Sequence, residues 1–327
     1  MKYLEFNDKL SAANCFAVEE YIINNGDFTD DYFLLWRTRP TLMIGRFQNT
    51  IEEINTKFVE DNKLEIVRRN SGGGTIYTDE NCWQFSFITW KNSGEIKNFQ
   101  DFTKPVISAL MLLGIDAEFA GRNDLLLNGK KFSGNAQFGT KDRFLHHGSI
   151  LFDANLENLI RALTVADEKI ISKGIKSIKE RVINIKEYLK NPNISSIEFS
   201  RQLIELLKKD MQTIHLSEKD LKNIEKIERE KFLSWEWNFG KSPEFNIRKT
   251  KRFDGGKIDI QLNVKNGIIT NCKIFGDFFY TGDISKIENL LTGTPYRKSD
   301  IYNKLKNIEE RYIFYSINVD DLFSCFF

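Results

Sequence analysis

Three short segments gather the residue types that could bind an anion. The first is VRRNSGGGTIYTD, Val67 to Asp79, in which Arg68 and Arg69 precede three consecutive glycines. A glycine run lets a flat or elongated ligand lie against the backbone, and a guanidinium group can form two parallel hydrogen bonds to a phosphate or carboxylate. The segment has neither a P-loop pattern nor a GxGxxG that opens a helix, so neither common nucleotide-binding loop is supported. The alternative is a glycine-rich turn with a surface arginine pair.

The second segment, GRNDLLLNGKKFSGNAQ, runs from Gly121 to Gln137 and has the hairpin signal Asn128–Gly129 at its centre. The carboxylate of Asp124 could hold Mg²⁺, and Lys130 or Lys131 could contact a phosphate as a point charge. Taken alone, Asn-Asp is more often a turn signal and Lys-Lys more often a solvated hairpin tip.

The third segment, FLHHGSILF, places His146 and His147 side by side in a hydrophobic strand. Adjacent strand residues face opposite sides of a sheet, so only one of the two can face a given site. We expect the other to be structural, and for the same reason metal binding by the pair is disfavoured.

The elements that must position these segments are strands and helices in irregular order. Hydrophobic patterning predicts helices over 11–25, 55–62 and 99–114, strands over 31–38, 41–47, 64–70 and 82–90, a helical Lys/Glu-rich stretch over 156–233, and a second hairpin over 256–276 around Asn266–Gly267. This order predicts an α+β fold with a mixed sheet rather than regular βαβ winding, with a domain boundary near residues 239–246.

Composition narrows the function classes. The 327 residues carry a net charge of +1, which predicts neither a nucleic-acid partner nor a membrane-attracting surface. No signal peptide is visible, and the longest apolar run has about ten residues, against about 20 for a membrane-spanning helix. The four cysteines form no CxxC pair, which favours reduced thiols and a cytoplasmic location. Three histidines make a His-rich metal site improbable.

In their order and spacing, the three segments resemble the motifs of the lipoate–protein ligase family. RRNSGGGTIYTD is similar to the family pattern RRxSGGGxVYHD, GRNDL followed by GKKFSGNA to its second motif, and HHGSIL to its HHGTLL element. The resemblance covers almost the whole chain. It implies a catalytic domain over 1–244 with the mixed sheet of class II aminoacyl-tRNA synthetases and biotin ligases, and a small α+β C-terminal domain over 248–327.

The resemblance also implies a two-step, ATP- and Mg²⁺-dependent reaction. The carboxylate of lipoate, or of octanoate, attacks the α-phosphate of ATP to give the acyl-adenylate and pyrophosphate. A specific lysine of an acceptor protein then takes the acyl group. The acceptors of the family are apo lipoyl domains of 2-oxoacid dehydrogenases and the H protein of glycine cleavage.

Residue by residue, Lys131 matches the catalytic lysine of the family, and Arg69 rather than Arg68 matches its ligand-contacting arginine. Lys130 should point to the opposite face. The implied adenylate-binding residues are Arg69, Gly74, Thr75, Ile76, Tyr77, Asn123, Asp124 and Lys131, with Asp124 as the Mg²⁺ ligand. The implied lipoate-binding residues are Gly45, Arg46, Ser71, Gly72, Gly73, Lys131, Ser133, Gly134, His147 and Gly148. Ser172 to Val182 matches the mobile loop that covers the adenylate.

The chain departs from the family pattern at one position of the first motif. Thr78 stands where the family usually has histidine, and threonine cannot carry a proton near neutral pH. This argues against an essential acid–base role there, or indicates altered substrate use. The GN that usually follows the aspartate is also altered, since the chain here reads Asp79–Glu80–Asn81–Cys82, and this leaves the choice of acceptor open.

Two alternatives remain at this stage. An ATP-independent lipoyl or octanoyl amidotransferase would need a nucleophilic cysteine, and Cys82 lies nearest to the motif, although a small buried hydrophobic role suits it better. A non-catalytic lipoate- or adenylate-binding protein would keep the pocket without turnover, which the presence of Lys131 and Asp124 disfavours. Biotin ligase and nucleic-acid binding fit less well.

Overall fold

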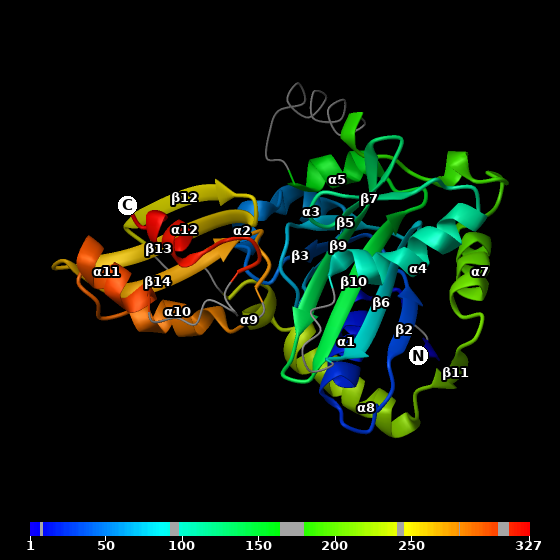
Figure 1. The fold of residues 1–327 in the computed structure, drawn as a ribbon, viewed down its shortest axis with the longest axis horizontal. Coiled ribbons are helices and arrows are strands. Elements are labelled where there is room, and N and C mark those ends of the chain that lie inside the picture. Colours follow the sequence, from blue (N-terminus) through cyan, green and yellow to red (C-terminus); the bar gives the residue numbers. More distant parts are fainter. Residues whose placement is uncertain (7–8, 92–97, 164–179, 241–244, 281, 307–313) are drawn as a thin grey trace.

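The computed structural model describes residues 1–6, 9–91, 98–163, 180–240, 245–280, 282–306 and 314–327 (Figure 1). The helices of this part are α1 (Ala12–Asn24), α2 (Thr50–Glu53), α3 (Thr56–Asp61), α4 (Phe99–Leu112), α5 (Leu156–Leu163), α7 (Ser196–Leu207), α8 (Glu218–Ile227), α9 (Trp235–Asn238), α10 (Ile284–Leu291), α11 (Lys298–Leu305) and α12 (Val319–Ser324), with the single turns η1 (Lys186–Tyr188) and η2 (Glu228–Phe232).

A mixed eight-stranded sheet in the order β11-β1-β2-β6-β10-β9-β8-β7 forms the centre of the molecule. Its strands are β1 (Lys2–Glu5), β2 (Tyr32–Trp36), β6 (Cys82–Trp90), β7 (Glu118–Ala120), β8 (Asp124–Leu127), β9 (Lys130–Gly139), β10 (Arg143–Leu151) and β11 (Gln212–His215). β1 pairs in parallel with β2 and β11, whereas the remaining pairs are antiparallel. The predicted mixed sheet is confirmed.

Two three-stranded sheets complete the fold. β3 (Thr41–Ile44) lies between β4 (Glu65–Arg68), which is parallel to it, and the antiparallel β5 (Ile76–Thr78). β12 (Ile247–Phe253), β13 (Gly256–Lys265) and β14 (Ile268–Gly276) form an antiparallel meander that packs with α10, α11 and α12 around a core of its own. Figure 1 shows this small C-terminal domain beside the larger one.

The large sheet is covered on both faces, and alternate residues of each strand enter different cores. Phe33 and Phe85 pack with α4 and α7, in the same core as Phe102 and Phe199. Leu34 and Trp36 pack with α1 and α8 on the opposite face. The pocket described below lies on the α1 face.

Most predicted elements agree with the structure. The Ser11 hydroxyl caps α1 by accepting a hydrogen bond from the Asn14 N–H at 3.3 Å, and β6 has the predicted bounds. The turn residues Asn128 and Gly129 both have positive φ, as a tight hairpin requires. The helical prediction over 156–233 falls partly on residues 164–179, which lie outside the described residues. It is wrong over 183–195, where the only helical turn is η1. It is also wrong at β11, a four-residue edge strand whose partly exposed residues QTIH give almost no hydrophobic alternation.

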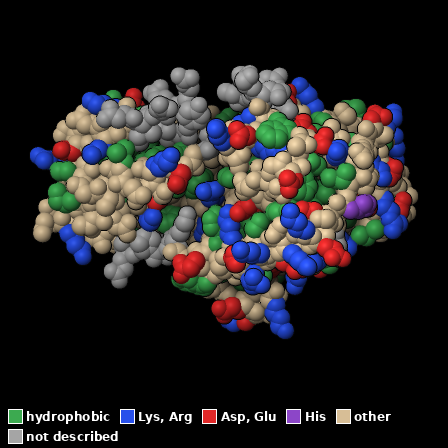
Figure 2. All heavy atoms as spheres, turned by 90° about the horizontal axis from the view of Figure 1, so that it is seen from below, with side chains coloured by type: hydrophobic (Ala, Val, Ile, Leu, Met, Phe, Trp, Pro, Cys, Tyr) green, Lys and Arg blue, Asp and Glu red, His purple; other side chains and the backbone are tan. Residues whose placement is uncertain are grey.

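Acidic and basic side chains are interspersed over the face drawn in Figure 2, in agreement with the net charge of +1. Within the described residues, no helix is both long and apolar enough to span a membrane.

Candidate active site

The glycine loop, residues 69–75, connects β4 to β5. Gly73 has a φ of +90°, which glycine adopts more readily than other residues. Its N–H donates to the Phe278 carbonyl of the C-terminal domain at 3.3 Å. A Cβ on Gly72 would lie 2.2 Å from the same oxygen. The missing side chain at Gly72 is therefore explained by the approach of the C-terminal domain, whereas the sequence suggested the approach of a ligand.

The two arginines that precede the loop are both buried, so the alternative of a surface arginine pair is wrong. Arg68 is 1% exposed and donates to the backbone carbonyls of Gly45, Gln48 and Trp237 at 2.9, 2.6 and 2.8 Å. Burial lowers the pKa of Arg68 to about 10. Its hydrogen bonds tie β4 to neighbouring loops, and it does not line the pocket.

Arg69 shapes the glycine loop from the inside. Its guanidinium donates to the carbonyls of Gly72 and Gly74, both at 2.7 Å, and to that of Met43 at 2.9 Å. Burial lowers the pKa of Arg69 to about 10, with a smaller effect from Arg68, so the group is charged at neutral pH. No carboxylate of the described residues forms an ion pair with it. An uncompensated buried cation favours an anionic ligand in the adjoining pocket.

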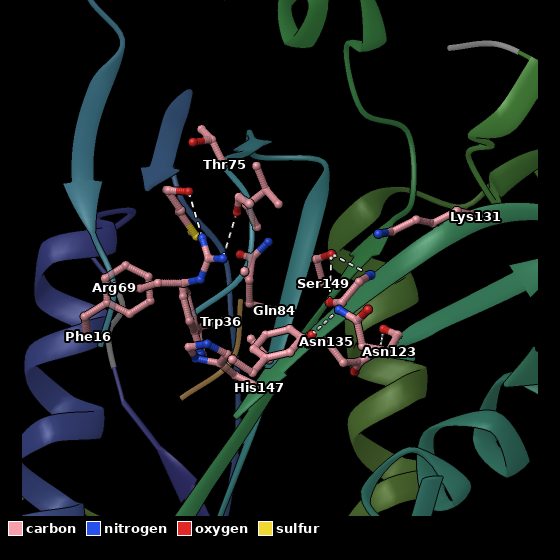
Figure 3. Close-up of a pocket in the computed structure, with 18 residues that line it drawn as sticks. Phe16, Trp36, Arg69, Thr75, Gln84, Asn123, Lys131, Asn135, His147 and Ser149 are labelled. Atoms are coloured by element: carbon pink, nitrogen blue, oxygen red, sulfur yellow. Dashed lines mark hydrogen bonds between the residues drawn. The ribbon is translucent and has the colours of Figure 1, made fainter. Parts of the chain in front are cut away.

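Lys131 enters the pocket from the β8–β9 hairpin. Its Nζ lies 2.7 Å from Asp124 Oδ1 on the neighbouring strand, and its side chain is 40% exposed. A Cβ on Gly134 would lie 3.1 Å from the same Nζ, so the lysine extends over a backbone without a side chain. Figure 3 shows it across the pocket from Arg69 and Gln84. Lys130 does not line the pocket, in agreement with the prediction that it faces away.

The two histidines face opposite sides of the sheet, as predicted. His147 lines the pocket, with Nε2 2.6 Å from Ser71 Oγ and Nδ1 3.2 Å from both carboxylate oxygens of Glu19. Because a carboxylate only accepts, Nδ1 carries a proton, and in the neutral ring Nε2 accepts from the Ser71 hydroxyl. His146 is fully buried in the other core, stacked on Phe102 at 4.8 Å. Burial lowers the pKa of His146 well below its usual value.

These elements enclose a pocket of about 660 Å³ including the space at its mouth (Figure 3). The predicted site residues that line it are Arg69, Gly73, Gly74, Thr75, Ile76, Asn123, Lys131, Gly134, His147 and Gly148. Residues that the sequence did not reveal are Phe16, Trp36, Met43, Gln84, Asn135, Ala136, Ser149 and Phe279. The aromatic residues Phe16 and Trp36 lie on one side of the pocket, and the polar residues Asn123, Lys131, Asn135 and Ser149 lie on the other (Figure 3). An amphipathic ligand suits this arrangement.

Several predicted residues do not line the pocket, namely Gly45, Arg46, Ser71, Gly72, Tyr77, Asp124 and Ser133. Asp124 and Ser71 lie just outside the pocket, where each contacts a residue of its lining. Asp124 forms an ion pair with Lys131, and Ser71 is hydrogen-bonded to His147. Tyr77 faces the opposite side of β5, in another hydrophobic cluster. The Arg46 guanidinium lies over the rings of Phe138 and Trp237, outside the pocket, where burial lowers its pKa.

Two family patterns match almost the full length of the chain. Residues 11–208 match the lipoyl protein ligase A/B catalytic domain, and residues 242–326 match the bacterial lipoate protein ligase C-terminus. The chain belongs to the lipoyl protein ligase A/B family.

This family member is 45% identical over 310 residues to the lipoate-protein ligase LplJ of Bacillus subtilis, with 93% of each chain covered. P. falciparum LipL1, solved in complex with lipoate, shares the fold with a TM-score of 0.78 at 23% identity, over 99% of this chain and 98% of that one. The bipartite lipoate protein ligase of Thermoplasma acidophilum, described with its E2 lipoyl domain, has a TM-score of 0.66 at 26% identity, over 75% of this chain and 98% of that one.

In this family member, Cys82 is unsuited to act as a nucleophile. It is fully buried and does not line the pocket. Burial raises the pKa of its thiol well above the usual value, with the nearby Asp79 as a further cause. The thiolate is the nucleophilic form of cysteine, so the geometry disfavours a cysteine-dependent amidotransferase. The predicted role as a small buried side chain agrees with its position.

The loop that was predicted to cover the adenylate runs from Ser172 to Val182. Most of this predicted lid lies outside the described residues, which resume at residue 180. Immediately after it, the Ile183 N–H donates to the Lys131 carbonyl at 2.9 Å. The residue that follows the predicted lid is thus hydrogen-bonded to the strand that carries Lys131.

Proposed function

We propose that this chain is an ATP-dependent lipoate–protein ligase. It activates the carboxylate of lipoate to lipoyl-AMP, with release of pyrophosphate, and transfers the lipoyl group to a lysine amine of an acceptor protein. The observation that carries the proposal is the position of Lys131. Its side chain lines the same pocket as the glycine loop and the aromatic residues Phe16 and Trp36. The ligase names of the relatives support it.

Activation joins two anions, which repel each other. Arg69 and Lys131 supply positive charge on the two sides of the pocket, and Lys131 Nζ can donate to the carboxylate and the α-phosphate together. Such preorganised donors stabilise the charge that develops at phosphorus and then at the carbonyl carbon. Asp124 holds Lys131 in position through the 2.7 Å ion pair.

Asp124 is also the residue that would hold Mg²⁺, which would neutralise phosphate charge when bound with the nucleotide. The described residues contain no group of three or more His, Cys, Asp or Glu side chains that could hold a metal ion. Magnesium is commonly held by one or two carboxylates together with substrate phosphates, so the proposed site needs only Asp124 from the protein.

In the proposed assignment, the nucleotide lies on the backbone of Gly74 to Tyr77 and beside Asn123. The acyl chain lies between Gly73, His147 and Gly148 on one side and the aromatic residues Phe16 and Trp36 on the other. Residues outside the lining, such as Gly45, Arg46, Ser71, Gly72 and Ser133, support these contacts indirectly. Residues 1–244 form the catalytic domain and 248–327 the accessory domain, and Ser172 to Val182 covers the adenylate.

The proposed acceptors are apo lipoyl domains or the glycine-cleavage H protein, and the joint description of the archaeal relative with its E2 lipoyl domain supports the first class. The proposed location is the cytoplasm, because all four cysteines are buried free thiols.

A panel of acceptors tests the proposal. The chain is incubated with ATP, Mg²⁺ and either lipoate or octanoate, together with several apo lipoyl domains and H proteins, and acceptor mass is measured. We expect one acceptor lysine to gain one acyl group, strictly dependent on ATP. Acyl transfer without ATP from an acyl thioester or an acylated protein, supplied in a parallel reaction, would instead indicate an amidotransferase, and ligand binding without any adenylate or transfer would indicate a non-catalytic binding protein.

A further inference from the structure

Gln84 is a polar residue in the middle of the pocket floor. In the sheet register it lies between Trp36 on β2 and Ser149 on β10, and all three side chains line the pocket. It is only 3% exposed. Figure 3 shows it below Thr75, with Arg69 on one side and Ser149 on the other.

The carboxamide of Gln84 is held at one end only. Its Nε2 donates to Thr78 Oγ1 at 2.9 Å, and the Thr38 hydroxyl approaches the same oxygen at 3.5 Å. Gln84 Oε1 is buried and has no hydrogen-bond partner in the described residues. Buried polar atoms in folded proteins are rarely left unpaired, so an orphaned acceptor beside a pocket points to a partner supplied by the ligand.

We propose that Gln84 is a specificity-determining residue whose Oε1 accepts a hydrogen bond from an N–H, O–H or S–H group of the bound substrate. The inference rests on the proposed ligase function for the identity of the substrates. Oxidised lipoate and octanoate carry no such donor on their chains. The nucleotide carries an amino group and ribose hydroxyls, and reduced lipoate carries two thiols.

Thr78 thereby acquires a defined role. Thr78, which replaces the usual histidine of the family, orients the Gln84 carboxamide, because the Thr78 hydroxyl oxygen accepts the hydrogen bond from Gln84 Nε2. With Nε2 engaged, Oε1 is the atom left for the ligand. Thr78 is a positioning residue in this arrangement, because it does not itself line the pocket.

Binding measurements on the full chain test the inference. Gln84→Leu removes the acceptor at similar volume, and Gln202→Leu on α7, away from the pocket, is the matched control. Affinities are measured by calorimetry for ATP, inosine triphosphate, 2′- and 3′-deoxy-ATP, lipoate, reduced lipoate and octanoate. We expect Gln84→Leu to weaken the donor-carrying ligand about tenfold, to leave its donor-lacking analogue unchanged, and so to abolish discrimination between the two.

The pair of ligands between which Gln84→Leu no longer discriminates identifies the donor group, which is the amino group, a ribose hydroxyl or a thiol. Thr78→Val should weaken the same ligand to a smaller extent, and thermal melting checks that each variant is folded. Affinities unchanged within twofold, or an equal loss for every ligand, would overturn the inference. Because binding is measured without turnover, a failure of the ligase reaction would be seen separately and would not decide the role of Gln84.

Discussion

His146 and His147 are neighbours in the sequence, but they face opposite sides of β10, where His146 packs on Phe102 and His147 on Phe16. His147 is held by Glu19 and Ser71 at the pocket wall. The Glu19 carboxylate also accepts from the Ser86 hydroxyl at 2.6 Å, which in turn accepts from the Trp36 indole N–H at 2.9 Å. The buried Glu19 carboxylate thus holds two residues that line the pocket, His147 directly and Trp36 through Ser86.

The depressed pKa of His146 makes stability depend on pH in a defined direction. The unfolded chain gains a proton at this position near pH 6.5, whereas the folded chain resists it, so the free energy of unfolding decreases as pH falls below about 6.5 and is unaffected by this group above that value. The limiting slope is about 1.4 kcal/mol per pH unit.

Urea unfolding of the wild type and His146→Gln between pH 7.5 and 5.5 measures this contribution. We expect the pH slope of the variant to be smaller than that of the wild type by up to one proton, because the variant has no group at this position that gains a proton on unfolding. Equal slopes in the wild type and His146→Gln would contradict the expectation.

Among the elements, those with strong local signals were predictable from the sequence. The cap at Ser11, the alternation of β6 and the Asn-Gly turns each specify a local conformation. β11 was not predictable, because pairing with β1 rather than its own pattern makes it a strand. Phe16 and Trp36 were assigned correctly to a helix and a strand, but nothing local distinguishes an aromatic residue that lines a pocket from one that fills a core.

The glycine loop illustrates the same limit. Its need for glycine was evident from the sequence, but the atom that requires it, the Phe278 carbonyl, comes from a residue about 200 positions further along the chain. That contact depends on how the C-terminal domain packs, which no local pattern encodes.

Gly72→Ala should therefore destabilise the protein. A Cβ at this position would lie 2.2 Å from a backbone oxygen, so the loop or the C-terminal domain must shift, at a cost of about 1–3 kcal/mol. At Gly74 the nearest atom to a new Cβ is 4.0 Å away, so Gly74→Ala should be neutral or slightly stabilising. Urea unfolding midpoints compare the two variants, and similar midpoints for both would show that the contact with Phe278 does not constrain the loop.

At the scale of the whole molecule, the pocket is shared between the two domains. Phe279 is its contribution from the C-terminal domain, and the Arg122 guanidinium lies 4.6 Å from the centre of that ring. Arg122 also donates to the Gly255 carbonyl, and the Gly276 N–H donates to the Phe47 carbonyl at 2.8 Å. The site is therefore complete only when the C-terminal domain is docked as in this structure. The motifs predicted Arg69, Lys131 and other residues of the pocket lining, but not the wall that Phe279 forms.

The proposed chemistry depends most directly on Lys131. The decisive measurement is the rate of lipoate-dependent pyrophosphate release from ATP in the wild type, Lys131→Ala and Lys130→Ala, with thermal melting as a check on folding. Loss of one preorganised donor should lower the rate by about 10²–10³ in Lys131→Ala, while Lys130→Ala stays near the wild type. A rate near that of the wild type in a folded Lys131→Ala variant would contradict the proposed adenylation mechanism.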